Sequence, residues 1–161
     1  MDDDTKPQDS SQLKDAKRSI RYHTVGAAAA LLLPVPLLDV ALLIGIQVNL
    51  VRSLAKIYDM PFSDEVGKSL VSALIGVSVP GAAWSLTKLI PIVGMVSASA
   101  AGAASTYAVG KVFVQHFESG GTFLTFDPSK VRQHYESELS KGAGKASDGL
   151  YQEEDFGGIK P

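Results

Sequence analysis

The sequence predicts an all-α protein: proline-broken apolar helical hairpins that pack as a small bundle, associate with a membrane and carry disordered polar tails. Three observations predict this class. Charged residues are concentrated near the two ends of the 161-residue chain, whereas its centre is strongly apolar. Apolar residues in the centre recur at the three- and four-residue spacing of a helix. Prolines and glycines divide the centre into segments of helical length.

Four segments follow from this pattern of charge and hydropathy. Residues 1–19 form a polar N-terminal tail that turns basic towards its end, and residues 20–121 form the apolar helical domain. Residues 122–141 hold a short polar helix, and residues 142–161 form a C-terminal polar tail. Both tails are expected to be disordered, because they hold too few apolar residues to bury a core. The apolar residues within 150–159 fit either a short docking motif or a solvated tail.

The first helical unit is expected over residues 25–58. Pro34 ends a short apolar helix of residues 25–33, because proline lacks an N–H donor and restricts the residue before it. Pro36 can occupy the first turn of the next helix, which runs to about residue 58. That helix has an apolar stripe and an opposite polar or small stripe: Leu43, Ile46, Leu50, Leu54 and Ile57 against Gly45, Asn49, Arg52 and Lys56. Such a pattern favours a helix with one face towards water or a polar partner.

The second helical unit is expected over residues 66–118. It begins after Ser63, a good N-cap, and the acids Asp64 and Glu65 favour a first helical turn electrostatically. Pro80–Gly81 breaks or kinks the helix that follows. This unit is therefore also expected to be a hairpin of helices interrupted by proline.

Two uncharged runs, residues 69–87 and 89–110, make up most of the second unit, with Lys88 between them. In the second run a small residue recurs every four positions, at Gly94, Ala98, Gly102, Thr106 and Gly110. Small side chains at this spacing let two helix backbones approach closely, either in a membrane or in a soluble helix pair. We therefore expect a helix-packing face here, and self-association of the protein.

The end of the chain's apolar part is marked by turn-forming residues. Gly120–Gly121 is expected to stop the preceding helix. Residues 122–126 fit a short extended piece. Asp127–Pro128 combines an N-cap with proline at the first helical position, and it predicts a polar helix to about residue 140.

Composition and motifs argue against several functional classes. The net charge of −2 lacks the basic footprint of a nucleic-acid-binding protein, and the absence of cysteine excludes disulfides and thiolate sites. The three histidines are isolated in the sequence: His23, His116 and His134. Gly67-Lys68-Ser69 resembles the end of a phosphate-binding loop, but Phe62 occupies the position that requires the first glycine. We therefore expect a protein that is not an enzyme and binds no cofactor or metal.

Asp39 is the acid within the apolar runs that most needs an explanation. By helical angle it falls near Leu43 and Ile46, where a buried carboxylate would be costly and a functional candidate. Alternatively, it lies in the first turn after Pro36, where its charge favours the free N–H groups of the helix start. The sequence leaves both interpretations open.

Three blocks of residues, taken in order, resemble a known family. They are Pro34-x-Pro36-x-x-Asp39 with Gln47 and Leu54-Ala55-x-Ile57-Tyr58; Lys88-Leu89-x-Pro91-x-x-Gly94; and Thr106-Tyr107-Ala108-Val109-Gly110-Lys111 with Phe117-Glu118-x-Gly120-Gly121. Together they resemble the bacterial domain of unknown function 697, found in YcjF-like inner-membrane proteins and attached to Era-like or dynamin-like GTPase domains. The resemblance covers about residues 20–121 and implies membrane association and partnership with GTPases. It implies no activity and no catalytic residues.

The function predicted from these features is a non-enzymatic, membrane-associated helical module for anchoring, scaffolding or oligomerisation, with a GTPase as a possible partner. The alternative is a soluble, compact helical bundle that binds a protein or a lipid. Lys14, Lys17, Arg18 and Arg21 precede the first apolar run, and basic flanks of this kind stay on the cytoplasmic side. The expected location is therefore the cytoplasmic face of the bacterial inner membrane, or the cytoplasm under the alternative. Membrane lipid and a second copy of the chain are the other expected partners.

Overall fold

The structure is a computed structural model that describes residues 6–30, 39–89 and 94–147. Within these ranges it describes the side chains of residues 10–30, 41–76 and 100–146. Every regular element in these residues is an α-helix, which confirms the predicted all-α class. The helices are α1 (Lys6–Ala30), α2 (Asp39–Ile57), α3 (Asp64–Leu89), α4 (Gly94–Glu118) and α5 (Pro128–Ser147).

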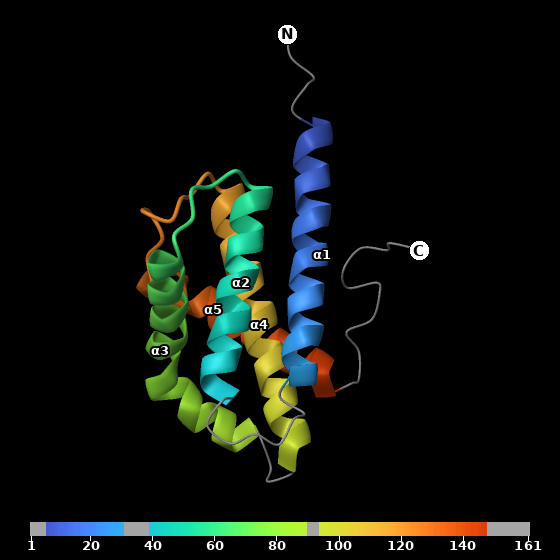
Figure 1. Ribbon diagram of the computed structural model, residues 1–161. Helices are drawn as coiled ribbons and strands as arrows, with labels where there is room; N and C mark the ends of the chain where they lie inside the picture. The colour runs from blue at the N-terminus through green and yellow to red at the C-terminus, as the bar shows by residue number, and fades with distance from the viewer. Residues whose placement is uncertain (1–5, 31–38, 90–93, 148–161) are drawn as a thin grey trace, which may run out of the picture.

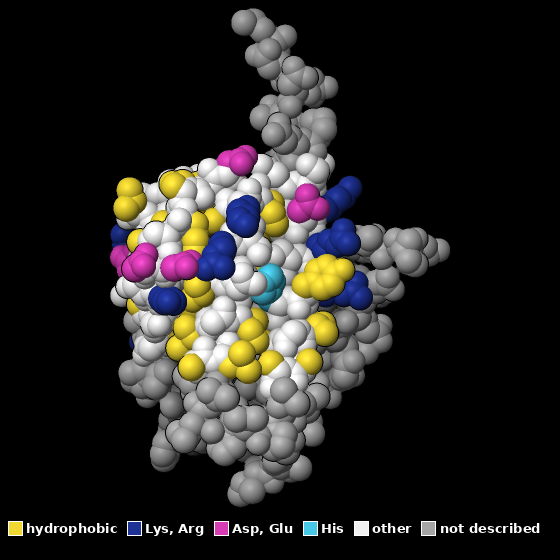
Figure 2. Space-filling view, in the orientation of Figure 1, with side chains coloured by type: hydrophobic (Ala, Val, Ile, Leu, Met, Phe, Trp, Pro, Cys, Tyr) yellow, Lys and Arg dark blue, Asp and Glu magenta, His cyan; other side chains and the backbone are white. Residues whose placement is uncertain are grey.

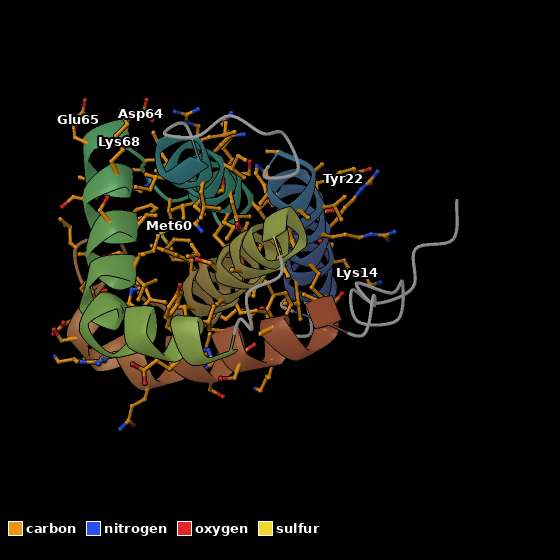
Figure 3. All side chains as sticks on the ribbon, turned by 90° about the horizontal axis from the view of Figure 1, so that it is seen from below. Lys14, Tyr22, Met60, Asp64, Glu65 and Lys68 are labelled. Atoms are coloured by element: carbon orange, nitrogen blue, oxygen red, sulfur yellow. The ribbon has the colours of Figure 1, made fainter. Side chains whose placement is uncertain are left out.

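Helices α1 to α4 lie side by side and alternate in direction, while α5 crosses behind them (Figure 1). Figure 3, viewed along the bundle from below, shows α5 running across one side of it. α4 contacts all four other helices, most extensively α5 and α1. A helix in this central position needs small side chains where its neighbours approach closely, and the composition of α4 provides them.

Two close approaches show why small residues are needed on α4 and α5. A Cβ atom built on Gly110 of α4 would lie 2.6 Å from Cγ1 of Ile20, which belongs to α1. A Cβ atom built on Gly142 of α5 would lie 3.0 Å from the Cα atom of Ala104 on α4. α1 therefore packs on a glycine of α4, and a glycine of α5 packs on the backbone of α4.

Aromatic side chains fill the end of the core where α4 stops. The rings of Phe113 and Phe126 are stacked with their centroids 4.4 Å apart, and Phe117 meets Phe123 edge-on at 5.2 Å. Phe123 and Phe126 come from the segment after α4, so this segment folds back onto the helix that precedes it. Residues 123–125 form a turn there, and the expected extended piece over 122–126 is wrong.

The helix starts agree with the capping residues. The backbone N–H of Val66 donates to Ser63 Oγ at 3.3 Å, so Ser63 is the N-cap of α3. At α5, the N–H of Ser129 donates to Asp127 Oδ1 at 3.0 Å, one residue after Pro128 opens the helix. Both predicted starts are confirmed, because a capping side chain satisfies N–H groups that have no partner in the first turn.

Two helices end in the same way, although their sequences differ. After α2, Asp59 has a φ of 53° and the N–H of Met60 donates to Ala55 O at 2.7 Å. After α4, Gly120 has a φ of 78° and the N–H of Gly121 donates to His116 O at 2.9 Å. This is the Schellman arrangement, in which a left-handed residue lets the chain satisfy the last free carbonyl groups.

The largest difference from the sequence analysis is at the N-terminus. Residues 6–30 form one helix, so the expectation of a disordered tail over 1–19 and of a separate short helix from residue 25 is wrong for the described part. Leu13, Ala16 and Ile20 lie on one face of α1 and pack on the core. The basic residues between them concealed this face, and the helical domain therefore begins well before residue 20.

The other differences concern α3 and α5. α3 continues through Pro80 to Leu89, and Figure 1 shows its last part bending towards the base of α4, so the proline kinks the helix rather than ending it. α5 extends to Ser147, which corrects the expected start of the C-terminal tail at residue 142. Close packing of Gly142 on Ala104 accounts for this extension. The possible docking motif within 150–159 lies outside the described residues.

Candidate functional site

The predicted small-residue face lies on α4, and its described part is used inside the bundle. Gly102, Thr106 and Gly110 are buried, and Thr106 Oγ1 donates to Gly102 O at 2.8 Å. Gly110 faces Ile20 of α1. Gly94 and Ala98 lie in the first turns of α4, and their surroundings are outside the described residues. Self-association through this face stays a prediction.

A buried polar chain joins three helices near the middle of α4. Gln47 of α2 is fully buried, and its Nε2 donates to Ser105 Oγ at 3.0 Å and to Thr106 Oγ1 at 3.5 Å. Ser105 Oγ lies 3.0 Å from the hydroxyl of Tyr135 on α5. Burial raises the pKa of the Tyr135 hydroxyl, against a smaller opposing effect of its hydrogen bond with Ser105. Among these described groups no nucleophile is paired with a base, and their hydrogen bonds join α2, α4 and α5.

The role of Gln47 in joining helices was not predicted from the sequence, although the residue belongs to the first block that resembles the family. The signal available in the sequence was an uncharged polar residue between Ile46 and Val48, on the helix face with the apolar stripe. Ser105 and Thr106 are a matching polar pair within the uncharged run. Only the packing of α2 on α4 shows that Gln47 contacts Ser105 and Thr106.

A second polar chain crosses the surface of α1, α2 and α3 at one height. The Nδ1–H of His23 donates to Ser19 O at 2.8 Å, which leaves Nε2 free to accept from Asn49 Nδ2 at 3.2 Å. Arg52 donates to Asn49 Oδ1 at 3.4 Å and binds Asp64 at the start of α3. The hydrogen bond from Arg52 lowers the pKa of the exposed Asp64 carboxyl. We call these residues the polar seam.

Beyond the polar seam, four helices bring uncharged segments to the same end of the bundle. This end is formed by the C-terminal parts of α1 and α3 and the N-terminal parts of α2 and α4 (Figure 1). Lys, Arg, Asp and Glu are absent from residues 24–30, 40–51, 69–87 and 94–110. On the face in Figure 2, charged side chains lie in the upper part, and apolar or uncharged ones border the lower end. We call this region the uncharged end.

Several side chains of the uncharged end are both apolar and exposed. Val25 of α1 is 49 % exposed and Leu42 of α2 is 42 % exposed. Ala29, one turn after Val25, and Ala41, the residue before Leu42, are also exposed. Tyr22, whose ring lies 5.7 Å from the guanidinium of Arg18, points away from α1 just before this region (Figure 3). Exposed apolar side chains gathered at one end of a molecule mark an interaction surface.

Asp39 and Lys88 are the charged residues of this end in the sequence. Asp39 opens α2, the position that its first-turn interpretation requires, and its side chain is outside the described residues. Lys88 lies one residue before the end of α3, and its side chain is likewise not described. The choice between a buried and a first-turn Asp39 stays open.

The residues that resemble a phosphate-binding loop and two of the three histidines lie on α3, α4 and α5. Gly67 and Lys68 lie in the first turns of α3, and Gly67 is buried against the ring of Phe62, so the loop that cradles a phosphate is replaced by helix. His116 and His134 line one cavity of about 240 Å³ between α4 and α5. Within the described residues there is no group of three or more His, Cys, Asp or Glu arranged to hold a metal ion.

Over the described ranges, none of the helices combines the length and the apolarity that a membrane-crossing segment needs.

Comparison with known proteins places these features in a family. The family model described as "Domain of unknown function (DUF697)" matches residues 8–141. This match includes most of α1 and α5, in agreement with their place in the bundle. A relative named Magnetosome membrane protein 22, from Magnetospirillum gryphiswaldense (strain DSM 6361 / JCM 21280 / NBRC 15271 / MSR-1), is 36 % identical over 141 residues, which are 82 % of this chain and 72 % of the relative. No solved structure matches the chain.

Proposed function

Because the chain belongs to the family of the domain of unknown function 697, we propose that it is a non-enzymatic, membrane-associated helical module that anchors or scaffolds other proteins. The observation that carries this proposal is the uncharged end, to which four helices contribute. The relative's name, which describes a magnetosome membrane protein, supports the same conclusion. Neither the family description nor that name specifies an enzymatic activity.

The mode of attachment that fits the uncharged end is insertion of the helix ends into the membrane interface. Val25 and Leu42 expose about half of their surface there, so burying each in an apolar environment contributes up to about half of the roughly 1.5–3 kcal/mol of a fully exposed side chain. Tyr22 lies at the border of this surface, where an aromatic ring with a polar tip is favoured in membranes. Arg18 lies one turn further from the uncharged end, in position for lipid phosphates.

The location proposed for this module is the cytoplasmic face of the bacterial inner membrane. Its support is the basic character of α1, where Lys14, Lys17, Arg18 and Arg21 precede the uncharged end. Basic residues beside an apolar segment are retained on the cytoplasmic side.

A GTPase partner and self-association are the finer parts of this proposal. The support for a GTPase is the resemblance to modules that are attached to GTPase domains. The support for self-association is the small-residue face of α4, although Gly102, Thr106 and Gly110 already pack inside one chain. Assembly would therefore depend on the part of that face near Gly94 and Ala98.

The proposal is tested by placing a charge on the uncharged end. We expect the purified protein to sediment with phospholipid vesicles, and Val25→Glu and Leu42→Glu to lose most of this binding. A carboxylate at either position must be dehydrated or protonated on insertion, which is costly. Thermal melting should remain near that of the parent, because both positions are exposed in the bundle.

Leu124→Glu is the matched control, since Leu124 is 96 % exposed and lies in the turn after α4, at the other end of the bundle. This variant should bind vesicles as the parent does. The proposal would be overturned if all three variants lost vesicle binding equally. It would also be overturned if the parent protein were monodisperse and did not bind vesicles. The latter result would favour a compact bundle that binds a protein partner.

A further inference from the structure

We propose that a rim of basic residues borders the uncharged end on helices α1 to α4 and selects membranes with anionic headgroups. This inference rests on the proposed membrane association and adds the class of lipid. On each of these helices, the charged residue nearest to the described part of the uncharged end is a cation. These residues are Arg21 of α1, Arg52 of α2, Lys68 of α3 and Lys111 of α4. We call these four residues the basic rim.

Contacts between helices place the basic rim at one level. His23, two residues from Arg21, is hydrogen-bonded to Asn49, three residues from Arg52. A rise of about 1.5 Å per helical residue therefore puts the two arginines at nearly the same height.

The other two helices are aligned by similar contacts. Arg52 binds Asp64, and Lys68 follows Asp64 by one helical turn in the direction of the uncharged end. Gly110 packs on Ile20, which fixes Lys111 beside the level of Arg21. By the same helical rise, the four cations lie within roughly 8 Å of one another along the bundle axis.

Two acids, Asp64 and Glu65, lie near the four cations of the basic rim, which leaves a net positive charge. Asp64 is paired with Arg52, and this pair is half exposed. Glu65 lies beside Asp64, and Figure 3 shows both with Lys68 at the outer corner of α3. In the described structure no ion pair engages Arg21, Lys68 or Lys111. These three cations give the rim its positive charge.

A groove between α2 and α3 gives the basic rim a place for a headgroup. It has a volume of about 260 Å³, and its walls change in character along its length. Ala41, Ile44 and Val48 line the apolar part. Arg52, its partner Asp64 and Lys68 line the part at the rim, so Lys68 is the cation there that has no ion-pair partner among the described residues. A phospholipid would fit this groove with its phosphate beside the cations of the rim and its acyl chain along the apolar part.

The level of the basic rim also fits the depth to which an interfacial helix inserts. From Arg21 to Ala29, α1 rises by about 12 Å, and an apolar helix face is typically buried by about 5–10 Å at the headgroup boundary. With Val25 and Ala29 inserted, the rim would meet the phosphate layer. Anionic lipids attract basic residues at this distance, whereas neutral lipids do not.

The test compares vesicles of phosphatidylcholine alone with vesicles of equal parts phosphatidylcholine and phosphatidylglycerol, using the full chain. We expect the parent to prefer the anionic vesicles, and added salt to remove the preference. The rim variant Arg21→Gln, Lys68→Gln and Lys111→Gln should lose roughly a hundredfold in affinity for anionic vesicles, at about fivefold for each cation. Its binding to phosphatidylcholine alone should not change.

The control removes the same number of cations elsewhere, with Lys14→Gln, Lys56→Gln and Lys130→Gln. Both triple variants should melt within a few degrees of the parent, because all six side chains are on the surface or half-buried. The role of the basic rim would be overturned if the parent bound both kinds of vesicle with equal affinity, or if the two triple variants lost the same affinity for anionic vesicles. Either result would leave membrane association intact. Failure of the parent to bind either vesicle would overturn the proposed function and the rim together.

Discussion

At the scale of single residues, glycines of this bundle have opposite roles that depend on what surrounds them. Gly110 faces the side chain of Ile20 at a distance that leaves no room for a methyl group. Gly45 on α2 has no atom within 4 Å of the position that a Cβ would take. The first glycine is therefore required by packing, whereas the second weakens its helix without any compensating contact.

This contrast gives the first prediction. Gly110→Ala should lower the free energy of unfolding by about 1–3 kcal/mol, because the added methyl forces Ile20 out of its position. Gly45→Ala should raise it by about 0.5–1 kcal/mol through better helix propensity. Urea unfolding of both variants measures the two effects. A stabilising Gly110→Ala would mean that α1 is not seated on α4 as described.

At the scale of elements, the helix ends show most directly how a local sequence fixes a local structure. Ser63, Asp127–Pro128 and Gly120–Gly121 were sufficient to predict two starts and one stop, because caps depend on a few neighbouring residues. α1 and the end of α5 could not be predicted in this way. Their apolar residues are spaced among charges, and both segments pack most extensively on α4, which lies far from them in the sequence or is separated from them by a turn.

The same limit applied to the candidate site. The uncharged runs were evident in the sequence, and so was the basic character of residues 14–21. Their arrangement at one end of the molecule depends on the alternating directions of four helices, which no single segment encodes. The buried contact of Gln47 with Ser105 joins residues 58 positions apart, a separation that local spacing cannot show.

The two Schellman ends give the second prediction. Asp59 adopts a left-handed conformation that glycine adopts at no steric cost, and the residue is exposed. Asp59→Gly should therefore stabilise the protein, by about 1 kcal/mol. Gly120→Ala should destabilise it by a similar amount, because alanine must take the left-handed conformation of Gly120. Thermal melting of the pair checks both signs, and a loss of stability in Asp59→Gly would contradict the argument.

At the scale of the whole molecule, the buried polar chain makes stability depend on pH. Tyr135 is 2 % exposed and hydrogen-bonded to Ser105, and its pKa is raised by burial. In the unfolded chain the same hydroxyl ionises near its usual pKa of about 10. The folded state therefore keeps a proton that the unfolded state loses, so stability falls as the pH rises from about 10 towards the raised folded value.

The third prediction tests this dependence. The melting temperature of the parent should fall steeply above about pH 10, and Tyr135→Phe should melt with a shallower decline in that range. At neutral pH the variant should lose about 1 kcal/mol with the hydrogen bond to Ser105. Tyr22→Phe is the control, because Tyr22 is 66 % exposed and lies outside the buried polar chain. Identical alkaline declines in both variants would exclude Tyr135 as the responsible group.

The hydrogen bond between His23 and Asn49 fixes the position of α1 along α2, so insertions or deletions in either helix near this bond would misalign the two. One residue inserted between Ile20 and His23 would turn the rest of α1 by about 100° and move it along the axis by about 1.5 Å. Ile20 would then no longer share a face with Thr24 and Ala27, which are both buried. Insertions and deletions within α1 and α2 are therefore expected to be poorly tolerated near this bond. Differences in length among relatives should occur in the connections between helices and at the two ends of the chain.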